Sequence, residues 1–373
     1  MAAVEGLTKI PELRRRILFT LGMLAVYRVG CHIPVPGINT ETLQRFFQSN
    51  QNTLFGMLNM WTGQAMENAS IFALGIMPYI SASIIFQLLT VVWPYLSQLS
   101  KEGEMGRKKI NQYTRYATVV IAIMQASGIT SALMAAEGES FVFLPSVTFR
   151  VISVITLAAG TAFIMWLGEQ ITERGIGNGI SLIIFAGIAA GIMGAGQRTI
   201  QMVRDGQISP LTIVLMLALM AVVIGVIIFI EQGQRRIPIQ YAKRQVGRRL
   251  YGGQSTHLPL KINTSGVIPP IFASSLLMAP LTVIAFLPPS IYTDFVRDII
   301  QRGGLVYYAA YVSLIVFFTF FYTAVVFNTV DVADNLKKYG GYVPGIRPGK
   351  NTSDYFDKVL ARITVGGALY LSI

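Results

Sequence analysis

Long apolar runs separated by short charged stretches dominate the chain. A helix needs about 20 mainly apolar residues to cross the hydrocarbon core of a bilayer, which is about 30 Å thick. The pattern therefore predicts eight membrane-spanning helices, at residues 17–33, 71–92, 113–134, 151–168, 180–193, 211–230, 267–287 and 305–327. A ninth apolar run begins at Ile363 and is too short to span before Ile373, so we expect the chain to stop inside its ninth span.

The composition agrees with a membrane protein. Of 373 residues, 53% are hydrophobic and only 13% are charged, whereas soluble domains carry about 25% charged residues. Too few charges are present to cover a surface that faces water, and disordered, collagen-like or disulfide-rich chains are excluded as well. Cys31 is the single cysteine, and His32 and His257 are the only histidines. We therefore expect neither an internal disulfide nor a metal site.

The charges are distributed unevenly across the predicted membrane. The chain holds 30 Lys and Arg against 18 Asp and Glu, a net charge of +12. Of the basic residues, 23 fall on the side of the N-terminus and seven on the other side. Because Lys and Arg concentrate in cytoplasmic loops, we expect residues 1–16 to form a cytoplasmic N-terminal segment.

One connection, residues 232–261, carries more basic residues than orientation requires and no acidic one. Tyr241 and Tyr251 lie among its basic side chains. This mixture favours a docking surface for an acidic partner or RNA phosphates over a purely topological signal. The basic residues are Arg235, Arg236, Lys243, Arg244, Arg248, Arg249 and Lys261.

A second predicted cytoplasmic connection, residues 330–362, mixes basic residues with four aspartates. It contains a run rich in turn-forming residues, Tyr342-Val343-Pro344-Gly345-Ile346-Arg347-Pro348-Gly349. Two prolines and two glycines around one arginine predict a fixed, exposed turn that presents Arg347.

Several kinds of chemistry lack the residues they need. The only Gly-Lys pair, Gly349-Lys350, has no upstream glycine at the offset of a nucleotide-binding loop. The glycine-rich run at residues 175–179 lies between two spans and predicts a tight cytoplasmic turn. The spans hold almost no ionisable residues, which disfavours an intramembrane enzyme and weakens an ion-coupled transporter. The transporter stays open, because backbone carbonyls at broken helices can bind sodium.

Two spans carry helix-breaking residues, at Gly75 to Pro78 and at Pro269-Pro270, which predicts that both line an internal path. Ile76 and Ile80 are four residues apart, as are Ile180 and Ile184 in the short fifth run. Each pair shares a helix face. Spacing alone favours ordinary packing, although a hydrophobic constriction also closes pores by excluding water. Residues 34–70 predict a surface loop or a re-entrant segment.

Four long runs in the chain resemble the SecY family, which forms the channel of the general bacterial protein translocon. They are Ala73-Leu74-Gly75-Ile76-Met77-Pro78-Tyr79-Ile80-Ser81-Ala82-Ser83; Gly168-Glu169-Gln170-Ile171-Thr172-Glu173-Arg174-Gly175-Ile176-Gly177-Asn178-Gly179; Tyr241-Ala242-Lys243-Arg244 with Gly247-Arg248-Arg249; and Val343-Pro344-Gly345-Ile346-Arg347-Pro348-Gly349. The resemblance covers essentially the whole chain in the same order.

The resemblance implies an all-α membrane channel of ten helices in two inverted five-helix halves. The N-terminal half would be residues 17–193 and the C-terminal half residues 211–373, with the ninth helix partial and the tenth absent. The resemblance implies no enzymatic activity, no cofactor and no metal. The expected partners are SecE and SecG, the motor ATPase SecA, the ribosome, signal peptides and nascent chains, and membrane lipids. The expected location is the bacterial inner membrane.

The resemblance also implies roles for individual residues. A hydrophobic pore ring would consist of Ile76, Ile80, Ile180, Ile184 and Ile271. A plug at about residues 53–66 would include Asn59, Met60, Trp61, Thr62 and Gly63. A lateral gate would be lined by Ser81, Ser83, Gln87, Gln125, Ser274 and Ser275, for which ordinary interhelical hydrogen bonds are an equal alternative. The connections 232–261 and 330–362 would be cytoplasmic docking segments for SecA and the ribosome. Their docking residues would be Lys243, Arg244, Arg248, Arg249 and Arg347.

Three functions are therefore weighed. A passive protein-conducting channel is the interpretation we favour. A secondary transporter of small solutes is supported by the predicted broken helices and opposed by the lack of intramembrane charge. A scaffold that recruits ribosomes without conducting anything is the third.

Overall fold

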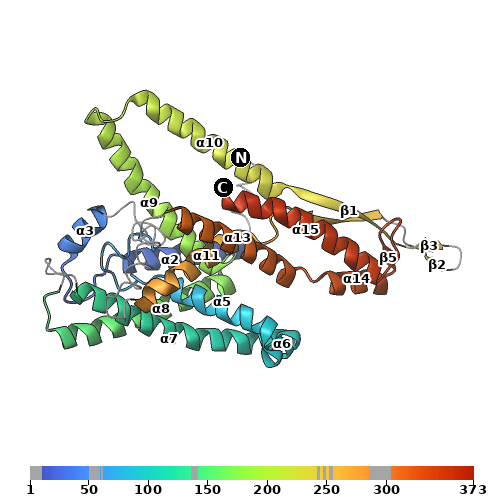
Figure 1. The fold of residues 1–373 in the computed structure, drawn as a ribbon, viewed down its shortest axis with the longest axis horizontal. Coiled ribbons are helices and arrows are strands. Elements are labelled where there is room, and N and C mark those ends of the chain that lie inside the picture. Colours follow the sequence, from blue (N-terminus) through green and yellow to red (C-terminus); the bar gives the residue numbers. More distant parts are fainter. Residues whose placement is uncertain are drawn as a thin grey trace. The chain divides into compact units, whose positions relative to one another are not determined.

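The computed structural model describes residues 11–49, 59, 62–135, 142–241, 244–246, 249–251, 255–284 and 304–373 (Figure 1). The helices are α2 (Pro11–Gly30), α3 (Thr40–Ser49), α5 (Met77–Val92), α6 (Pro94–Lys101), α7 (Glu104–Ala135), α8 (Ser146–Arg174), α9 (Gly179–Arg204), α10 (Pro210–Gln232), α11 (Ile268–Ile284), α13 (Leu305–Val326), α14 (Thr329–Lys338) and α15 (Lys350–Ser372). The strands are β1 (Gln234–Tyr241), β2 (Arg244–Val246), β3 (Arg249–Tyr251), β4 (Ser255–Lys261) and β5 (Gly341–Tyr342).

Each of the eight predicted apolar runs contains a helix, and the mostly helical fold confirms the predicted class. Within the described residues, four helical stretches are long and apolar enough to cross a membrane. They are Ser146–Arg174, Gly179–Arg204, Pro210–Gln232 and Leu305–Lys338. The pair α5 and α6 makes a fifth if it is counted as one span, although the two helices meet at an angle of 97°. The sharp bend follows Val92, where Trp93 adopts an extended backbone and Pro94 starts α6.

One local prediction was wrong, and two were confirmed only in part. The fifth run is not short, because α9 continues to Arg204 over 26 residues; the apolar run ends earlier, but helix hydrogen bonding does not depend on apolar side chains. The prolines do not break helices either. Pro78 lies in the first turn of α5, and Pro269-Pro270 lie in the first turn of α11, where the missing amide hydrogen has no helical partner to lose. Irregular backbone precedes α5 at residues 71–76, which include Gly75, so the predicted second span is interrupted before its helix begins.

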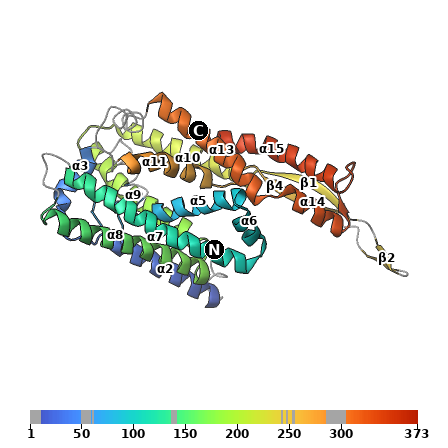
Figure 2. The same cartoon turned by 60° about the horizontal axis from the view of Figure 1, so that its bottom comes forward.

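The chain divides into two compact units, and the division falls within α11. The first unit comprises Met1–Arg204 and Ser275–Gly304. In it α7 packs along α5 and α8 (Figure 2). Ala122 and Ala126 of α7 are 0% exposed in a cluster with Leu157 and Ala158 of α8. Their small side chains let the two helices approach closely, as in other membrane-embedded bundles.

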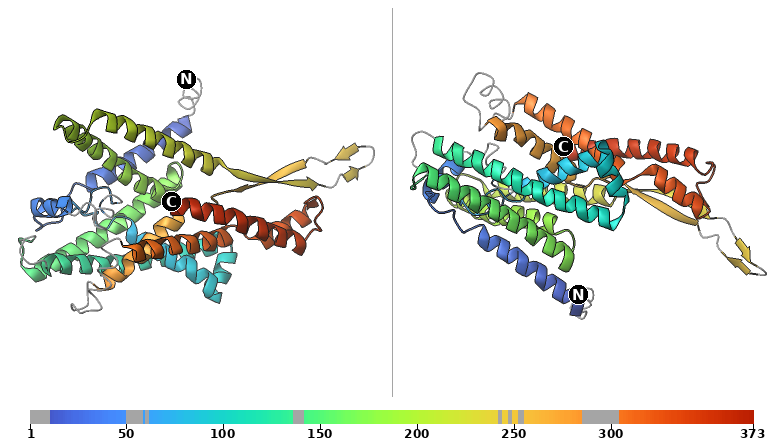
Figure 3. Two further views of the ribbon diagram at one scale, coloured as in Figure 1. Left: turned by 45° about the horizontal axis from the view of Figure 1, so that its top comes forward. Right: turned by 90° about the horizontal axis from the view of Figure 1, so that it is seen from below.

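The second unit comprises Asp205–Ser274 and Leu305–Ile373. Here β4, β1 and β5 form an antiparallel sheet in that order, with Gln234 of β1 opposite Lys261 of β4 and Gln240 opposite Ser255. The β1–β4 hairpin is long, and β2 and β3 pair at its tip (Figure 3). Helices α14 and α15 pack against each other, and α15 packs along α13.

The three long connections were predicted as loops or turns, and they contain regular structure instead. Residues 232–261 form the β1–β4 hairpin, residues 330–362 contain most of α14 and the start of α15, and residues 34–70 include α3. Only long apolar runs were predicted to form helices. Short strands and amphipathic helices lack such runs, because their apolar positions alternate with polar ones.

Candidate functional site

Four of the five predicted pore residues lie in the first unit. Ile76 directly precedes α5, and its carbonyl accepts the Ile80 amide at 3.1 Å. Both side chains are buried, at 6% and 7% exposure. Ile180 and Ile184 lie in the first turns of α9 and are half-buried. Ile271 lies on α11 in the second unit and is also half-buried. The ring that would unite all five stays a prediction.

The start of α5 is set by a turn that packs against the predicted plug. Gly75 has a φ of +58°, a left-handed conformation that glycine adopts without steric cost. A Cβ on Gly75 would lie 3.1 Å from Cγ2 of Thr62. The backbone just before Ile76 therefore rests against the Thr62 side chain.

Hydrogen bonds from Asn59 hold together the described residues of the predicted plug. Its Nδ2 donates to Oε2 of Glu67 at 2.9 Å, and its Oδ1 accepts from the Glu67 amide at 2.9 Å. The Asn59 carbonyl accepts from the Gln64 amide at 2.8 Å and from the Thr62 hydroxyl at 3.1 Å. Asn59 and Thr62 are 9% and 3% exposed, so this is a compact, buried turn. Met60, Trp61 and residues 53–58 lie outside the described residues.

Two consecutive residues of α2 hold the backbone of this turn. The Tyr27 hydroxyl donates to the Thr62 carbonyl at 3.2 Å, and Nη1 of Arg28 donates to the Gly63 carbonyl at 3.0 Å. A Cβ on Gly63 would lie only 2.8 Å from Cα of Gly187 on α9. Only glycine lets the chain pass α9 this closely. The turn is thus in contact with both α2 and α9.

The predicted tight turn between α8 and α9 is present, and its residues start α9. Oδ1 of Asn178 accepts hydrogen bonds from the backbone amides of Ile180 at 3.0 Å and Ser181 at 3.2 Å, as the side chain of a helix N-cap residue does. The Thr172 hydroxyl accepts from the Gly179 amide at 2.9 Å. A Cβ on Gly179 would lie 2.0 Å from the Gly168 carbonyl oxygen. The backbones of α8 and α9 are therefore in direct contact here, with no room for a side chain between them.

The two isoleucines of α9 share one face of that helix. Cγ1 of Ile180 lies 3.1 Å from where a Cβ on Gly168 would be, so Ile180 packs on α8. Ile184 is three residues before Gly187 and shares its helix face, and Gly187 contacts the predicted plug at Gly63. Ordinary packing thus explains part of the Ile180 environment, and Ile180 and Ile184 both lie on the face of α9 whose Gly187 meets the predicted plug.

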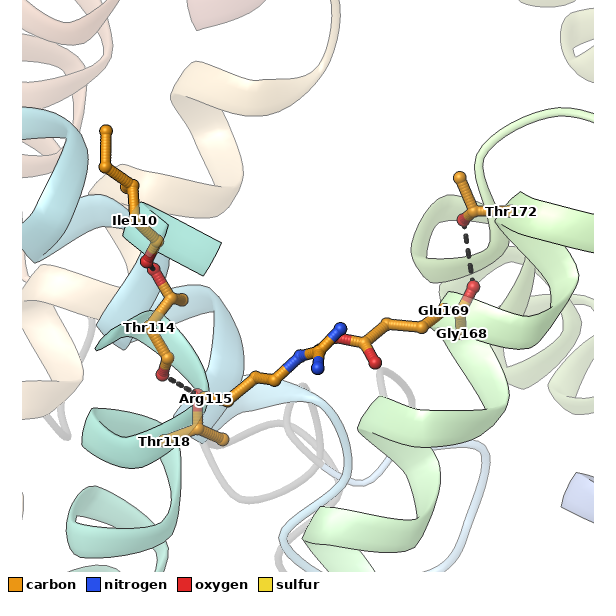
Figure 4. A network of polar contacts seen from close by, with 7 residues as sticks. All are labelled: Ile110, Thr114, Arg115, Thr118, Gly168, Glu169 and Thr172. Atoms are coloured by element: carbon orange, nitrogen blue, oxygen red, sulfur yellow. Dashed lines mark hydrogen bonds and ion pairs between the residues drawn. The ribbon is translucent and has the colours of Figure 1, made fainter. Parts of the chain in front are cut away.

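An ion pair joins α7 to α8. Nε of Arg115 lies 2.7 Å from Oε1 of Glu169 (Figure 4). In the same view, the hydroxyls of Thr114, Thr118 and Thr172 donate to carbonyls of their own helices. The pair is thus an interhelical link among side chains that otherwise bond locally.

The predicted lateral-gate residues lie on three helices: Ser81, Ser83 and Gln87 on α5, Gln125 on α7, and Ser274 and Ser275 on α11. Nε2 of Gln87 donates to the Ser83 hydroxyl at 3.3 Å, and the Ser274 hydroxyl donates to the Ile271 carbonyl at 2.8 Å. The Ser275 hydroxyl is buried and has no hydrogen-bond partner among the described residues. These bonds lie within helices rather than between them, and the lateral gate stays a prediction.

The two predicted docking segments fold together in the second unit. Ile237 and Ile239 of β1 are buried while the residues between and before them are exposed, as expected for a strand with one covered face. Ile237 packs with Val343 and with Phe356 of α15, which is 0% exposed. Arg235 and Arg236 are exposed at the base of the hairpin.

The turn around Arg347 is well defined. Gly345 and Gly349 have φ values of +81° and +103°. Ile346 packs on the core of the unit, whereas Arg347 is exposed. The Arg347 carbonyl accepts from the Thr352 hydroxyl at 2.9 Å, which fixes the backbone of the turn at the start of α15.

Two of the other predicted docking residues, Arg244 and Arg249, lie near the tip of the hairpin. Arg244 begins β2 opposite Tyr251, and Arg249 begins β3 opposite Val246. Lys243 and Arg248 lie outside the described residues. The docking roles of all these residues stay predictions.

Sequence reasoning missed Tyr27 and Arg28 as part of the site. Arg28 was assigned only to the count of basic residues on the outer side. Its signal was an arginine close to the end of an apolar run, where a charge is costly without a partner. The partner is a backbone carbonyl more than thirty residues away. Every residue has such a carbonyl, so the sequence does not show which one Arg28 binds.

These features define a multi-pass α-helical membrane protein with an irregular, buried segment beside the start of α5 and the middle of α9. Within the described ranges, no three His, Cys, Asp or Glu side chains gather to hold a metal ion. A family model described as SecY matches residues 70–373. The chain belongs to the SecY family.

Relatives and solved structures agree. The protein translocase subunit SecY of Escherichia coli strain K12 is 52% identical over 365 residues, which cover 97% of this chain and 82% of the relative. The same subunit of Vibrio cholerae is 50% identical over 377 residues, covering 100% of this chain and 84% of the relative.

Two solved structures share the fold at low sequence identity. One, titled "The structure of a protein conducting channel", has a TM-score of 0.63 at 17% identity and covers 96% of this chain and 84% of its own. Sec61 in the canine ribosome-channel complex has a TM-score of 0.59 at 17% identity with the same coverage of both chains. At this identity the likeness concerns the fold alone.

Proposed function

We propose that this SecY-family chain, a protein-conducting channel subunit, closes its pore with the isoleucines Ile76, Ile80, Ile180, Ile184 and Ile271. Unfolded secretory proteins would cross through this pore, and membrane-protein helices would leave sideways into lipid. The observation that carries the function is the identity of 52% across 97% of the chain to a translocase subunit. Family membership favours the channel over a small-solute transporter or an inert scaffold.

The geometry of the first unit supports the closed state of such a pore. Ile76 and Ile80 are buried, and Thr62 of the predicted plug lies against Gly75, the residue before Ile76. Branched apolar side chains exclude water and ions from a narrow path, and they offer a passing chain no hydrogen bonds that would hold it. A buried segment next to them adds a second barrier.

The channel is proposed to be passive and to be driven by partners. The sequence has no nucleotide-binding loop, so energy would come from the SecA ATPase or the translating ribosome. These would dock on Arg347 and on Lys243, Arg244, Arg248 and Arg249, where RNA phosphates or acidic side chains would find positive charge. SecE and SecG would be further subunits, and signal peptides would enter along Ser81, Ser83, Gln87, Gln125, Ser274 and Ser275.

The proposed location is the bacterial inner membrane, with the N-terminus in the cytoplasm. Counts of 23 and seven basic residues on the two sides support this orientation. It places both docking segments on the cytoplasmic side, where SecA and ribosomes are found.

A photocrosslinking experiment tests the pore. A photoreactive amino acid at Ile184, in the assembled translocon with a stalled secretory precursor, is expected to label the precursor. The matched control is Phe185, which is 65% exposed and lies on another face of α9. Equal labelling from both positions, or labelling from Phe185 alone, would contradict the proposed pore face.

A further inference from the structure

The strongest unassigned feature is the contact between Arg28 and the predicted plug. Arg28 lies two residues before the end of α2, and its guanidinium donates to the Gly63 carbonyl at 3.0 Å. The neighbouring Tyr27 hydroxyl donates to the Thr62 carbonyl at 3.2 Å. Two adjacent residues of one helix therefore bind two adjacent carbonyls of one turn.

These carbonyls need partners because the turn has neither helix nor strand hydrogen bonding at this point. Gly63 and Gln64 both have a φ of +67°. This left-handed backbone conformation is incompatible with a continuous right-handed helix or a strand. Thr62 is 3% exposed and Ala65 is 0% exposed. An unpaired carbonyl at such a position is costly, and a charged donor is the strongest partner that a side chain can supply.

The same turn contacts the two helices that carry the proposed pore isoleucines of the first unit. Gly63 lies against Gly187 of α9, and Thr62 lies against Gly75 at the entry to α5. Gln64 adds a contact to α9, since its Nε2 lies 3.6 Å from where a Cβ on Gly194 would be. A displacement of this turn would thus change the support of both helices.

We infer that Arg28 is a positioning residue of the closed channel: its bond to the Gly63 carbonyl holds the plug turn between α2, α9 and the start of α5. Opening requires this bond to break, so its loss shifts the resting channel toward the open state. The inference rests on the proposed function, in particular on the plug and on Ile76, Ile80 and Ile184.

The test uses the assembled translocon in proteoliposomes and two readouts. The first is ion leak without a precursor. The second is maleimide labelling of the native Cys31, the single cysteine of the chain, which is 0% exposed and follows α2 directly. Arg28→Gln is expected to raise the resting leak roughly tenfold, the ratio that corresponds to loss of one charge-assisted hydrogen bond, and to speed Cys31 labelling. Arg28→Lys, which keeps a charged donor, is expected to restore most of the seal.

The matched control is Arg150→Gln, because Nη2 of Arg150 also binds a neighbouring element, at the Ser131 hydroxyl. It should leave leak and labelling unchanged. If it raises both as much as Arg28→Gln does, the effect is general loosening and the inference is overturned. Leak and labelling at the wild-type level in Arg28→Gln would overturn it as well.

Two further variants separate this inference from the proposed function. Deletion of residues 56–66 should raise the leak if the plug seals the channel. A tight deletion variant would refute the plug itself, whereas a leaky deletion with a tight Arg28→Gln would refute only the role of Arg28. Gly63→Ala keeps Arg28 but places a Cβ 2.8 Å from Gly187. It should also leak, and a tight Gly63→Ala variant would contradict the inference even if the Arg28 variants do not assemble.

Discussion

Nε of Arg115 lies 2.7 Å from Oε1 of Glu169, and this bond links α7 to α8. The Arg115 side chain is 44% exposed and the Glu169 side chain is 21% exposed, so the pair is partly shielded from solvent. Exposed ion pairs contribute about 0.2–1 kcal/mol to stability. The shielding and short distance place this pair near the upper end of that range.

The first prediction concerns this pair. Arg115→Gln and Glu169→Gln should each lower the midpoint of thermal unfolding, and a double-mutant cycle should give a coupling of about 1 kcal/mol. The pair Glu104–Lys108 is the control, because its side chains are 84% and 74% exposed at a distance of 3.0 Å. Its coupling should be smaller. A coupling for Arg115 and Glu169 no larger than that of the control would show that the shielding has no effect.

The second prediction concerns the close approach of α8 and α9. Gly179→Ala would place a Cβ 2.0 Å from the Gly168 carbonyl oxygen, and backbone must move to admit it. We expect a loss of stability of about 1–3 kcal/mol, as for other overpacked positions. Gly191→Ala, also in α9, meets nothing within 4 Å and should be neutral or slightly stabilising. The measurement is thermal unfolding of the purified protein, and equal midpoints for both variants would contradict the close-packing argument.

The third prediction concerns the exposed turn of the second unit. Arg347→Glu should reduce motor-driven or ribosome-driven translocation roughly tenfold, as loss of a central charged contact does. The unfolding midpoint should not change, because the side chain is exposed. Arg107→Glu is the control, since Arg107 is an exposed basic residue of α7 outside both predicted docking segments. Normal translocation with Arg347→Glu would refute the docking role.

The fourth prediction concerns the hydrogen bonds between Asn59 and Glu67 in the proposed plug. Asn59 donates to the Glu67 carboxylate at 2.9 Å, so Asn59→Asp would place two carboxylates in contact. We expect a rise in resting ion leak, because like charges at this distance repel and an unmet hydrogen bond costs about 1–3 kcal/mol. Glu67→Gln in the Asn59→Asp background should lower the leak again, since an amide can donate to the new carboxylate. If the second change brings no recovery, the Asn59–Glu67 pairing does not hold the turn.

Much of the helical architecture was predictable because membrane-spanning helices need long apolar runs, and such runs are local in sequence. The prediction for residues 305–327 nearly coincides with α13, and that for residues 211–230 nearly coincides with α10. The β1–β4 hairpin was not predicted. Its alternation of buried Ile237 and Ile239 with exposed neighbours is short, and it gains meaning only when Val343 and Phe356 cover one face.

The apolar segments, the excess of basic residues in two connections and the motifs shared with the SecY family could all be identified from the amino-acid sequence. These are properties of residue type and spacing. The bond from Arg28 to the Gly63 carbonyl and the contact of Gly63 with Gly187 became visible only in the folded chain. Such contacts use backbone atoms that every residue has, and they join segments that helix packing brings together. No local pattern of residue types therefore predicts them.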